Sequence, residues 1–266
     1  MSMSIGCVGC GNMGGAILAG LAASSLDCTL YGHTRTAARM APLEAAGVTR
    51  LDSARELARK ARYVVMAVKP YQIEALLAEM APEFGPDTVV ISVAAGISIA
   101  RLQAAVAGRC PVVRCMPNTP ALVGKGVFAL CFDDKVPAES KEDILRFFSQ
   151  LGVCLELPES RFTAFSALIG AGPAYVFGMM QGLVQAGVTL GLGRKDCRDM
   201  VAALFEGSAV MAARSDTPLM ELRDQVCSPG GLTIAGVNVL DRVGLSGLLV
   251  DAVLAADERG REMEKE

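Results

Sequence analysis

Residues 5–15 read Ile5-Gly6-Cys7-Val8-Gly9-Cys10-Gly11-Asn12-Met13-Gly14-Gly15, a short apolar run that breaks into glycines before an apolar stretch at residues 16–21. The pattern predicts a strand, a tight turn and a helix. Gly9, Gly11 and Gly14 have the spacing of a dinucleotide-binding turn: the first permits the turn, the second lets the backbone approach a pyrophosphate, and the third packs the helix against the strand. The phosphates would lie at the helix N-terminus, where free N–H groups favour anions. A glycine-rich turn without any ligand is the alternative.

Length and composition favour a globular protein with a small-molecule ligand. The chain has 266 residues, of which 52% are hydrophobic, enough for one large domain or two smaller ones. Its formal net charge is -3, with both signs scattered and no run of Lys or Arg. Nucleic acid is therefore not an expected partner.

The nine cysteines are an odd number without compact spacing, which argues against a secreted disulfide framework. We interpret them as reduced thiols. Cys7 and Cys10 form a C-x-x-C, but they lie inside the glycine turn, where a redox or zinc role would compete with the nucleotide. We favour small residues that fit a crowded turn, and expect no metal site. No basic segment followed by an apolar one is evident at the N-terminus, so a cytoplasmic protein is expected.

The second predicted strand is residues 28–31, and the loop that follows it should select the cofactor. An NAD-selective fold places Asp or Glu here, but residues 28–43 contain no acid, while Arg35 and Arg39 are suited to a 2′-phosphate. NADPH is therefore expected, with NADH a weaker alternative. A solvated loop with ordinary surface arginines would explain the same residues. The single histidine, His33, is interpreted as a loop residue and not as a catalyst.

Apolar and helical segments then alternate. The predicted strands are residues 63–68, 88–93, 112–114, 127–132 and 153–157, and the predicted helices are 37–46, 54–61, 73–80 and 141–151. Near-continuous apolar strands of this kind predict a parallel sheet covered by helices on both faces. Ligands then belong at the carboxyl ends of the strands.

Three loops should meet at that edge: Lys69-Pro70, the loop 94–97 and the loop Met116-Pro117-Asn118-Thr119-Pro120. The two prolines make the last loop stiff, so that it could hold polar groups against a nicotinamide. Alternatively, the prolines only terminate a strand, Asn118 is a turn residue and Lys69 is a surface lysine.

Residues 162–193 contain no charged residue, a length that would suffice for a membrane span. We reject a span because glycines and a proline interrupt the run, because Gln181 and Gln185 lie in its second half, and because basic flanks of the positive-inside kind are lacking on a defined side. A helix that is apolar all round is otherwise buried, and Gly178, Gly182 and Ala186 would let another helix approach. The remaining predicted helices, 195–214, 218–226, 233–243 and 245–264, are too few to cover it, so self-association as a C2 dimer is expected.

A second glycine-rich turn opens a helix at residues 224–236, which include Ser228-Pro229-Gly230-Gly231-Leu232-Thr233. With no phosphate left to bind, its N–H groups suit a carboxylate, and the serine and threonine add hydroxyls. An ordinary interhelical loop is an equally good explanation of the turn taken alone.

The chain resembles the pyrroline-5-carboxylate reductase family over nearly its whole length. Five motifs match in order: residues 9–14, 67–70, 114–120, 172–175 and 228–233, the last being specific to the family. The resemblance implies an α/β protein with a Rossmann-like NAD(P)-binding domain (1–157) and an all-helical dimerisation and substrate-binding domain (158–266). It also implies NADPH-dependent reduction of 1-pyrroline-5-carboxylate to L-proline, the final step of proline synthesis, by dimers that often form decamers (pentamers of dimers).

The resemblance and the residues together give a set of expected site residues. The expected cofactor-binding residues are Gly9, Cys10, Gly11, Asn12, Met13, Gly14, His33, Thr34, Arg35, Ala67, Val68, Lys69, Pro70, Ala94 and Asn118. The expected substrate-binding residues are Ser228, Gly230, Gly231, Leu232, Thr233 and Asn118, and the expected catalytic residues are Thr233, Ser228 and Lys69. The chain departs from the family at Ala171, where serine is usual, and an upstream acidic residue is carried over only loosely to Asp216.

The residue inventory also favours an imine over a carbonyl substrate. Carbonyl reduction calls for a positioned acid such as His, Lys or Tyr, and the segment 170–192 lacks the lysine that similar β-hydroxyacid dehydrogenases carry. A cyclic imine takes its proton from solvent, so the enzyme mainly positions it beside the hydride donor. A β-hydroxyacid dehydrogenase and a non-catalytic NADPH sensor remain the alternatives.

Overall fold

The computed structural model describes residues 3–264, which form two compact units. The first unit comprises the residues up to Gly170 together with those from Asp257 onward, and the second comprises Ala171–Ala256. The sequence prediction divides the chain after residue 157. The first unit extends further because Phe162 and Phe165, beyond that point, pack in an apolar cluster with Ala129 of the sheet.

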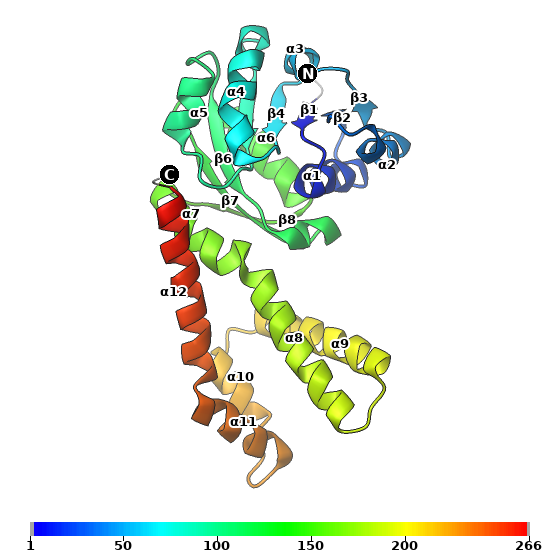
Figure 1. The fold of residues 1–266 in the computed structure, drawn as a ribbon, viewed down its shortest axis with the longest axis vertical. Helices are drawn as coiled ribbons and strands as arrows, with labels where there is room; N and C mark the ends of the chain where they lie inside the picture. The colour runs from blue at the N-terminus through cyan, green and yellow to red at the C-terminus, as the bar shows by residue number, and fades with distance from the viewer. Residues whose placement is uncertain (1–2, 265–266) are drawn as a thin grey trace. The chain divides into compact units, whose positions relative to one another are not determined.

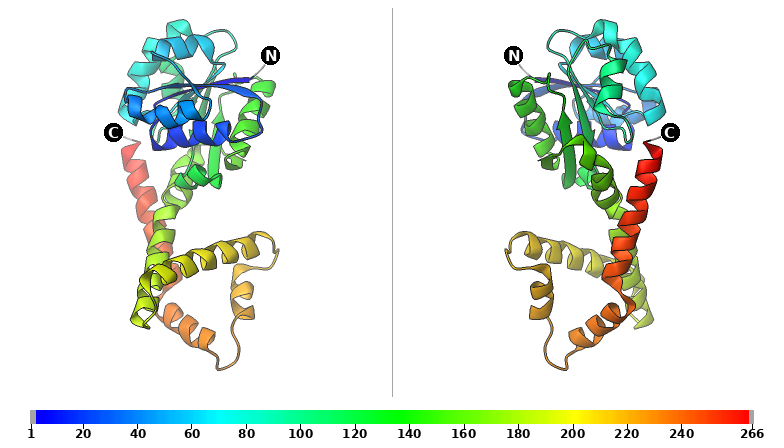
Figure 2. Two further views of the ribbon diagram at one scale, coloured as in Figure 1. Left: turned by 90° about the vertical axis from the view of Figure 1, so that its right-hand side faces the viewer. Right: turned by 90° about the vertical axis from the view of Figure 1, so that its left-hand side faces the viewer.

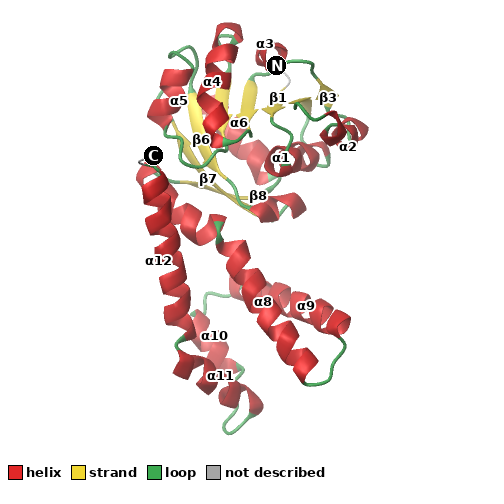
Figure 3. Ribbon diagram, in the orientation of Figure 1, coloured by secondary structure: helices red, strands yellow, loops and turns green. Residues whose placement is uncertain are grey.

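The first unit is built on one eight-stranded sheet with the strand order β3-β2-β1-β4-β5-β6-β7-β8 (Figures 1 and 3). Its strands are β1 (Met3–Val8), β2 (Cys28–His33), β3 (Thr49–Arg50), β4 (Tyr63–Met66), β5 (Val89–Ser92), β6 (Val112–Met116), β7 (Gly126–Phe132) and β8 (Gly152–Glu156). Strands β1 to β6 are all parallel, as the apolar runs predict. The order places the first strand beside β4, so the chain reverses its direction of progress across the sheet at β1, where ligands bind in such folds.

Helices cover both faces of this sheet. The helices are α1 (Asn12–Ala22), α2 (Ala41–Ala45), α3 (Ala54–Lys60), α4 (Pro70–Met80), α5 (Ile99–Ala105) and α6 (Ala138–Ser149). Ile17 of α1 and Phe147 of α6 belong to one core cluster, while Leu57 of α3, Leu77 of α4 and Leu102 of α5 belong to the other. Successive strand residues point to alternate clusters, so the sheet is buried on both sides.

Strand β7 runs antiparallel to β6, which corrects the expectation of a wholly parallel sheet. The connection, residues 117–125, holds only a 3-10 turn (Thr119–Val123). A parallel crossover takes about a dozen or more residues, usually with a helix, so this connection can only return antiparallel. Helix α6 then provides the crossover that makes β8 parallel to β7.

A short helical segment leads out of the first unit. It consists of a 3-10 turn (Glu159–Arg161), α7 (Phe162–Phe165) and a π turn (Ser166–Gly170). The run Glu159–Thr189 is long and apolar enough to cross a membrane by length and composition, which is weak evidence taken alone. In the structure the π turn interrupts this run.

The second unit contains helices and, within the described residues, no strand (Figures 2 and 3). Its helices are α8 (Gly172–Thr189), α9 (Arg194–Ala213), α10 (Leu219–Gln225), α11 (Leu232–Val243) and α12 (Leu245–Met263), whose last turns belong to the first unit. Helices α8 and α9 pack through Val184, Cys197 and Val201. The two helices approach closely at Gly187, where a Cβ would lie 2.6 Å from Cys197 Sγ, whereas a Cβ on Gly178 or Gly182 would have no atom within 4 Å.

Candidate active site

The turn between β1 and α1 needs glycine at two of its three motif positions. Gly9 has φ +96°, and its N–H donates to His33 O at 2.8 Å, tying the turn to the end of β2. A Cβ on Gly14 would lie 2.2 Å from Gly9 O, so the third glycine serves helix packing. The first intrahelical bond of α1 runs from Gly15 N–H to Gly11 O at 2.8 Å, which leaves the N–H groups of residues 12–14 for an anion, whereas the Gly11 N–H donates to Gly9 O at 2.8 Å.

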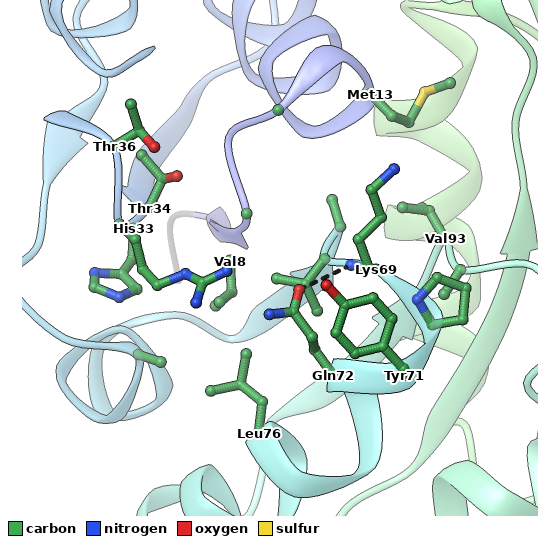
Figure 4. A pocket seen from close by; sticks show the side chains of 18 of the residues that line it. Val8, Met13, His33, Thr34, Thr36, Lys69, Tyr71, Gln72, Leu76 and Val93 are labelled. Atoms are coloured by element: carbon green, nitrogen blue, oxygen red, sulfur yellow. Dashed lines mark hydrogen bonds between the residues drawn. The ribbon is translucent and has the colours of Figure 1, made fainter. Parts of the chain in front are cut away.

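A cavity of about 1090 Å³ opens over this turn, inside the first unit (Figure 4). It brings together most of the predicted cofactor-binding residues, from the carboxyl ends of β1, β2, β4 and β5. These are Gly9, Gly11, Asn12, Met13, His33, Thr34, Arg35, Ala67, Val68, Lys69, Pro70 and Ala94. The converging strand ends thus place polar groups, glycine backbone and cations around one elongated space.

Cations lie at the β2 end of the cavity. Arg35 and Arg39 both line it, and Arg39 Nη1 lies 3.0 Å from the position that a Cβ on Gly11 would take. The guanidinium of Arg39 therefore lies across the glycine turn, within reach of a phosphate bound there. His33 is oriented by its Nδ1, which lies 3.0 Å from Leu51 O, and is the last residue of β2.

The wall formed by the start of α4 is polar and contains residues that the sequence analysis did not name. Lys69 projects into the cavity, and its backbone N–H donates to Gln72 Oε1 at 3.3 Å (Figure 4). Tyr71 is 82% exposed and lines the same space. Pro70 could have indicated this wall from sequence, because proline is common in the first turn of a helix. Helix α4 indeed begins at Pro70, three residues earlier than expected.

Two carboxylates, Asp52 and Glu79, also line the cavity and were missed. Asp52 follows β3, a strand of two residues that is too short to leave a pattern in the sequence. Its backbone N–H donates to Glu56 Oε2 at 3.3 Å. Neither carboxylate lies in the loop after β2, which contains no acid and carries Arg35.

Cys10, Gly14 and Asn118 do not line the cavity. Asn118 is 7% exposed, and its side-chain amide is used inside the protein. Its Nδ2 donates to Ile169 O at 3.3 Å, and its Oδ1 accepts the Val127 N–H at 2.9 Å. Asn118 thus fixes the loop after β6 to the start of β7 and to the π turn.

The thiols of the C-x-x-C pair lie below the turn. Cys10 is buried, and its Sγ donates to His33 O at 3.7 Å and to Cys7 O at 3.8 Å. A hydrogen bond between the Cys7 and Cys10 side chains lowers the pKa of Cys10 and, together with burial, raises the pKa of Cys7. All nine cysteines fall within residues 3–264 and are free thiols. Within those residues no group of three or more His, Cys, Asp or Glu side chains is arranged to hold a metal ion.

The second glycine turn, in the helical unit, joins α10 to α11. Gly230 has φ +69°, and the Gly231 N–H donates to Ser228 O at 3.0 Å. Gly231 is the N-cap of α11, and a Cβ there would lie 2.2 Å from Ser228 Oγ. Thr233 is the second residue of the helix, so it is not the cap. Leu232 is 95% exposed. The first N–H groups of α11, at Leu232 and Thr233, therefore precede the first intrahelical bond, from Ala235 to Gly231, and such groups suit an anion.

These features define a class of protein. A mainly parallel sheet with a glycine turn, free helix N–H groups and guanidinium groups at its carboxyl edge is a Rossmann-like nucleotide-binding domain, here followed by a helical unit with an anion-suited turn. Comparison with family models agrees with both parts. Residues 4–96 match the model described as NADP oxidoreductase, coenzyme F420-dependent, and residues 159–263 match the model of pyrroline-5-carboxylate reductase dimerisation.

Full-length relatives identify the family. The chain is 33% identical to pyrroline-5-carboxylate reductase of Escherichia coli K12, with 100% of both chains covered, and 34% identical to that of Pisum sativum, with 98% and 96% covered. It therefore belongs to the pyrroline-5-carboxylate reductase family.

Solved structures agree with this assignment. The reductase of Coxiella burnetii superimposes with a TM-score of 0.91 at 30% identity over 99% of both chains. The Plasmodium falciparum enzyme, solved with NADP bound, has a TM-score of 0.86 at 31% identity over 98% of both. The match to a dimerisation domain indicates an oligomeric protein.

Proposed function

We propose that this chain reduces 1-pyrroline-5-carboxylate to L-proline with NADPH, the final step of proline synthesis, in the cytoplasm. Membership of the reductase family supports the substrate and the reaction. The observation that carries the proposal furthest is that one chain contains both a phosphate-suited cavity, in the first unit, and a carboxylate-suited turn, in the helical unit.

The residues of the cavity fit NADPH. Gly9 and Gly11 keep side chains away from the turn, and the free N–H groups of α1 face the space where a pyrophosphate would lie. Arg35 would hold the 2′-phosphate, with Thr34 and His33 beside it, and Arg39 would reach the phosphates over Gly11. When bound, the cofactor supplies a hydride to the imine carbon. Cys10 and Gly14 contribute by packing below the turn.

The substrate would be held by the helical unit's turn. We assign its carboxylate to backbone N–H groups of the Gly230–Thr233 turn, apart from that of Gly231, which donates to Ser228 O, and to the Ser228 hydroxyl; its ring nitrogen is assigned to the Thr233 hydroxyl. The imine nitrogen takes one proton from solvent and the carbon takes the hydride, so that the C=N double bond becomes a C–N single bond and one N–H and one C–H bond form. Lys69 would border the nicotinamide, and Asn118 would act by fixing its loop.

We also propose that two chains associate as a C2 dimer through the helical unit, and that five dimers form a decamer. The apolar residues that the helical unit leaves exposed support an interface between copies, in preference to contact with lipid. Light scattering should then give a mass that is an even multiple of the 27.7 kDa chain.

One assay tests the function. Purified protein is mixed with NADPH and pyrroline-5-carboxylate, and absorbance at 340 nm is followed, beside a panel of β-hydroxy acids with NADP. We expect NADPH oxidation with the imine only. Oxidation of a β-hydroxy acid without imine reduction would assign a dehydrogenase, and nucleotide binding without either reaction would assign a sensor.

A further inference from the structure

Strand β6 carries a buried cation that the reaction does not use directly. Arg114 is 6% exposed, and its guanidinium contacts two carboxylates from distant parts of the sequence. Nη1 donates to Glu159 Oε1 at 3.0 Å, and Nη2 donates to Glu264 Oε1 at 3.4 Å. Its Cζ also lies 4.7 Å from the ring centroid of Phe162. Burying a guanidinium is costly unless it is paired, and this one is paired twice.

Each carboxylate is tied to a further element of the first unit. Glu159 Oε1 also accepts the N–H of Ile99 at 2.8 Å, and Ile99 begins α5 just after the loop that lines the nucleotide cavity. Glu264 Oε1 accepts the hydroxyl of Thr163 at 2.8 Å. We call Arg114, Glu159, Thr163 and Glu264 the Arg114 cluster. Near it, a Cβ on Gly260 would lie 2.7 Å from Thr163 Cγ2, so α12 approaches α7 closely.

Apart from Arg114 itself, the residues of the Arg114 cluster lie in the segments by which the chain leaves and re-enters the first unit. The chain leaves the first unit after Gly170 and returns to it at Asp257. Glu159 and Thr163 belong to the outgoing segment, and Glu264 belongs to the returning helix. One guanidinium, in the middle of β6, therefore contacts both the outgoing and the returning segment.

We infer that Arg114 is a positioning residue of the reductase: through Glu159 and Glu264 it fixes the two segments by which the chain leaves and re-enters the nucleotide-binding unit, and imine reduction depends on both segments being fixed. The inference rests on the proposed function, because that reaction uses groups from both units. It predicts a defect in the use of the imine without a defect in NADPH binding, since the nucleotide cavity lies wholly within the first unit.

The test compares two Glu→Gln changes on one helix end. Glu264→Gln removes a charge from the cluster. Glu262→Gln, the matched control, removes an exposed charge whose partner is Arg259 on the same helix at 2.8 Å. For each variant we would measure kcat and KM for pyrroline-5-carboxylate at saturating NADPH, the NADPH Kd by nucleotide fluorescence, and the initial rate of trypsin cleavage after Arg161 in the folded enzyme.

For Glu264→Gln we expect kcat/KM for the imine to fall on the order of 10- to 100-fold, the effect of a small misplacement of reacting groups, with the NADPH Kd changed less than about twofold. Cleavage after Arg161 should accelerate, because the outgoing segment is released. Glu262→Gln should behave like the wild type. Thr163→Val, which removes only the hydroxyl that contacts Glu264, should give a weaker form of the same pattern and serves if Glu264→Gln does not fold.

Equal imine kinetics and equal cleavage in the Glu264→Gln and Glu262→Gln variants would overturn the inference. A parallel rise in the NADPH Kd would also overturn it, because the cluster would then support the nucleotide domain alone. If the wild-type protein does not reduce the imine at all, the proposed function fails, and the cleavage rate after Arg161 still decides whether the cluster fastens the connecting segments.

Discussion

The two units bury their apolar residues to very different degrees. The nucleotide-binding unit has two large clusters in which residues such as Ile17, Leu77 and Phe147 are fully buried. The helical unit has one small cluster around Val184, Cys197 and Val201. Its exposed large apolar residues are Val176, Phe177, Leu183, Leu190, Leu192, Met200, Leu204, Val210, Met211, Leu219, Met220, Val226, Leu232, Val239, Leu240, Val243, Leu248, Val250 and Leu254.

The nucleotide-binding unit thus buries its apolar side chains within itself. The helical unit can bury most of its own only against another surface. The helical unit exposes so much apolar area that this surface is suited to an interface. Burying that area, at about 25 cal/mol per Å², would be a dominant source of stability. The four predictions below test each side of this contrast, beginning with the largest expected effect.

Gly14→Val should destroy the nucleotide-binding unit. The new side chain would meet Gly9 O at 2.2 Å and Ala67 Cβ at 2.9 Å, neither of which can yield without opening the turn. We expect a loss of about 4 kcal/mol or more of unfolding free energy, in the range of the most disruptive single substitutions. Urea unfolding and NADPH titration measure it. The neighbouring change Gly15→Ala, whose nearest atom is 3.8 Å away, should be neutral or stabilising. Equal damage from both changes would contradict the packing argument.

Thr233→Ala should impair the helical unit's chemistry and leave its stability alone. Gly231 caps α11 without a side chain, so removing the Thr233 hydroxyl costs the helix no cap. A hydrogen bond to the imine nitrogen in the transition state predicts a loss in kcat by a factor of about 10 to 1,000. Steady-state kinetics and a thermal melt separate the two effects. Thr233→Ser keeps the hydroxyl and should keep most activity; an inactive Ser variant beside an active Ala variant would remove Thr233 from the substrate site.

Phe177→Asp should break the association of copies. Phe177 lies on α8 with 65% of its surface exposed in the single chain. Placing a carboxylate in a covered apolar interface should weaken the dimer by about 3 kcal/mol or more, roughly 100-fold in Kd. Light scattering at micromolar concentration should then report the mass of one chain. Val153→Asp in β8, at a residue 59% exposed, is the control and should leave the assembly intact. An unchanged mass for Phe177→Asp would place the interface elsewhere.

Arginine replacements in the cavity should have the smallest effects and should differ from each other. Arg35→Ala is expected to cost about 1 to 3 kcal/mol in NADPH binding, the range of a charge-assisted hydrogen bond, with little change for NADH. Arg39→Ala should weaken both cofactors, because Arg39 lies over Gly11, where the shared pyrophosphate would bind. Parallel titrations with NADPH and NADH measure this. Equal losses of both cofactors in Arg35→Ala would refute the assignment of the 2′-phosphate.

Much of the first unit could be predicted from sequence because its signals are local. The glycine turn at residues 9–14 and the apolar strands such as Tyr63–Met66 carry their own patterns. The direction of β7 had no such signal, since it depends on the length of the connection before it. Helix α5 was missed although Ile99, Leu102 and Val106 have helical spacing, because the helix has only seven residues and gives a weak pattern.

The site divides in the same way. Backbone roles at Gly9 and Gly231 follow from residue type, whereas the orientation of a polar side chain depends on neighbours far along the chain. Asn118 was expected to face the nicotinamide, but Ile169 and Val127 take its amide. The return of the last turns of α12 to the first unit likewise depends on a pair, Arg114 and Glu264, separated by 150 positions.

That pair has a consequence for synthesis on the ribosome. Domains generally begin to fold in order of emergence, so β6 is in place long before the final helix has left the exit tunnel. Until Glu264 emerges, Arg114 is buried with only Glu159 as its carboxylate partner. Completion of the nucleotide-binding unit is therefore delayed until the residues from Asp257 onward have been made. The helical unit, made in between, is available to meet a second copy by the time that unit is complete.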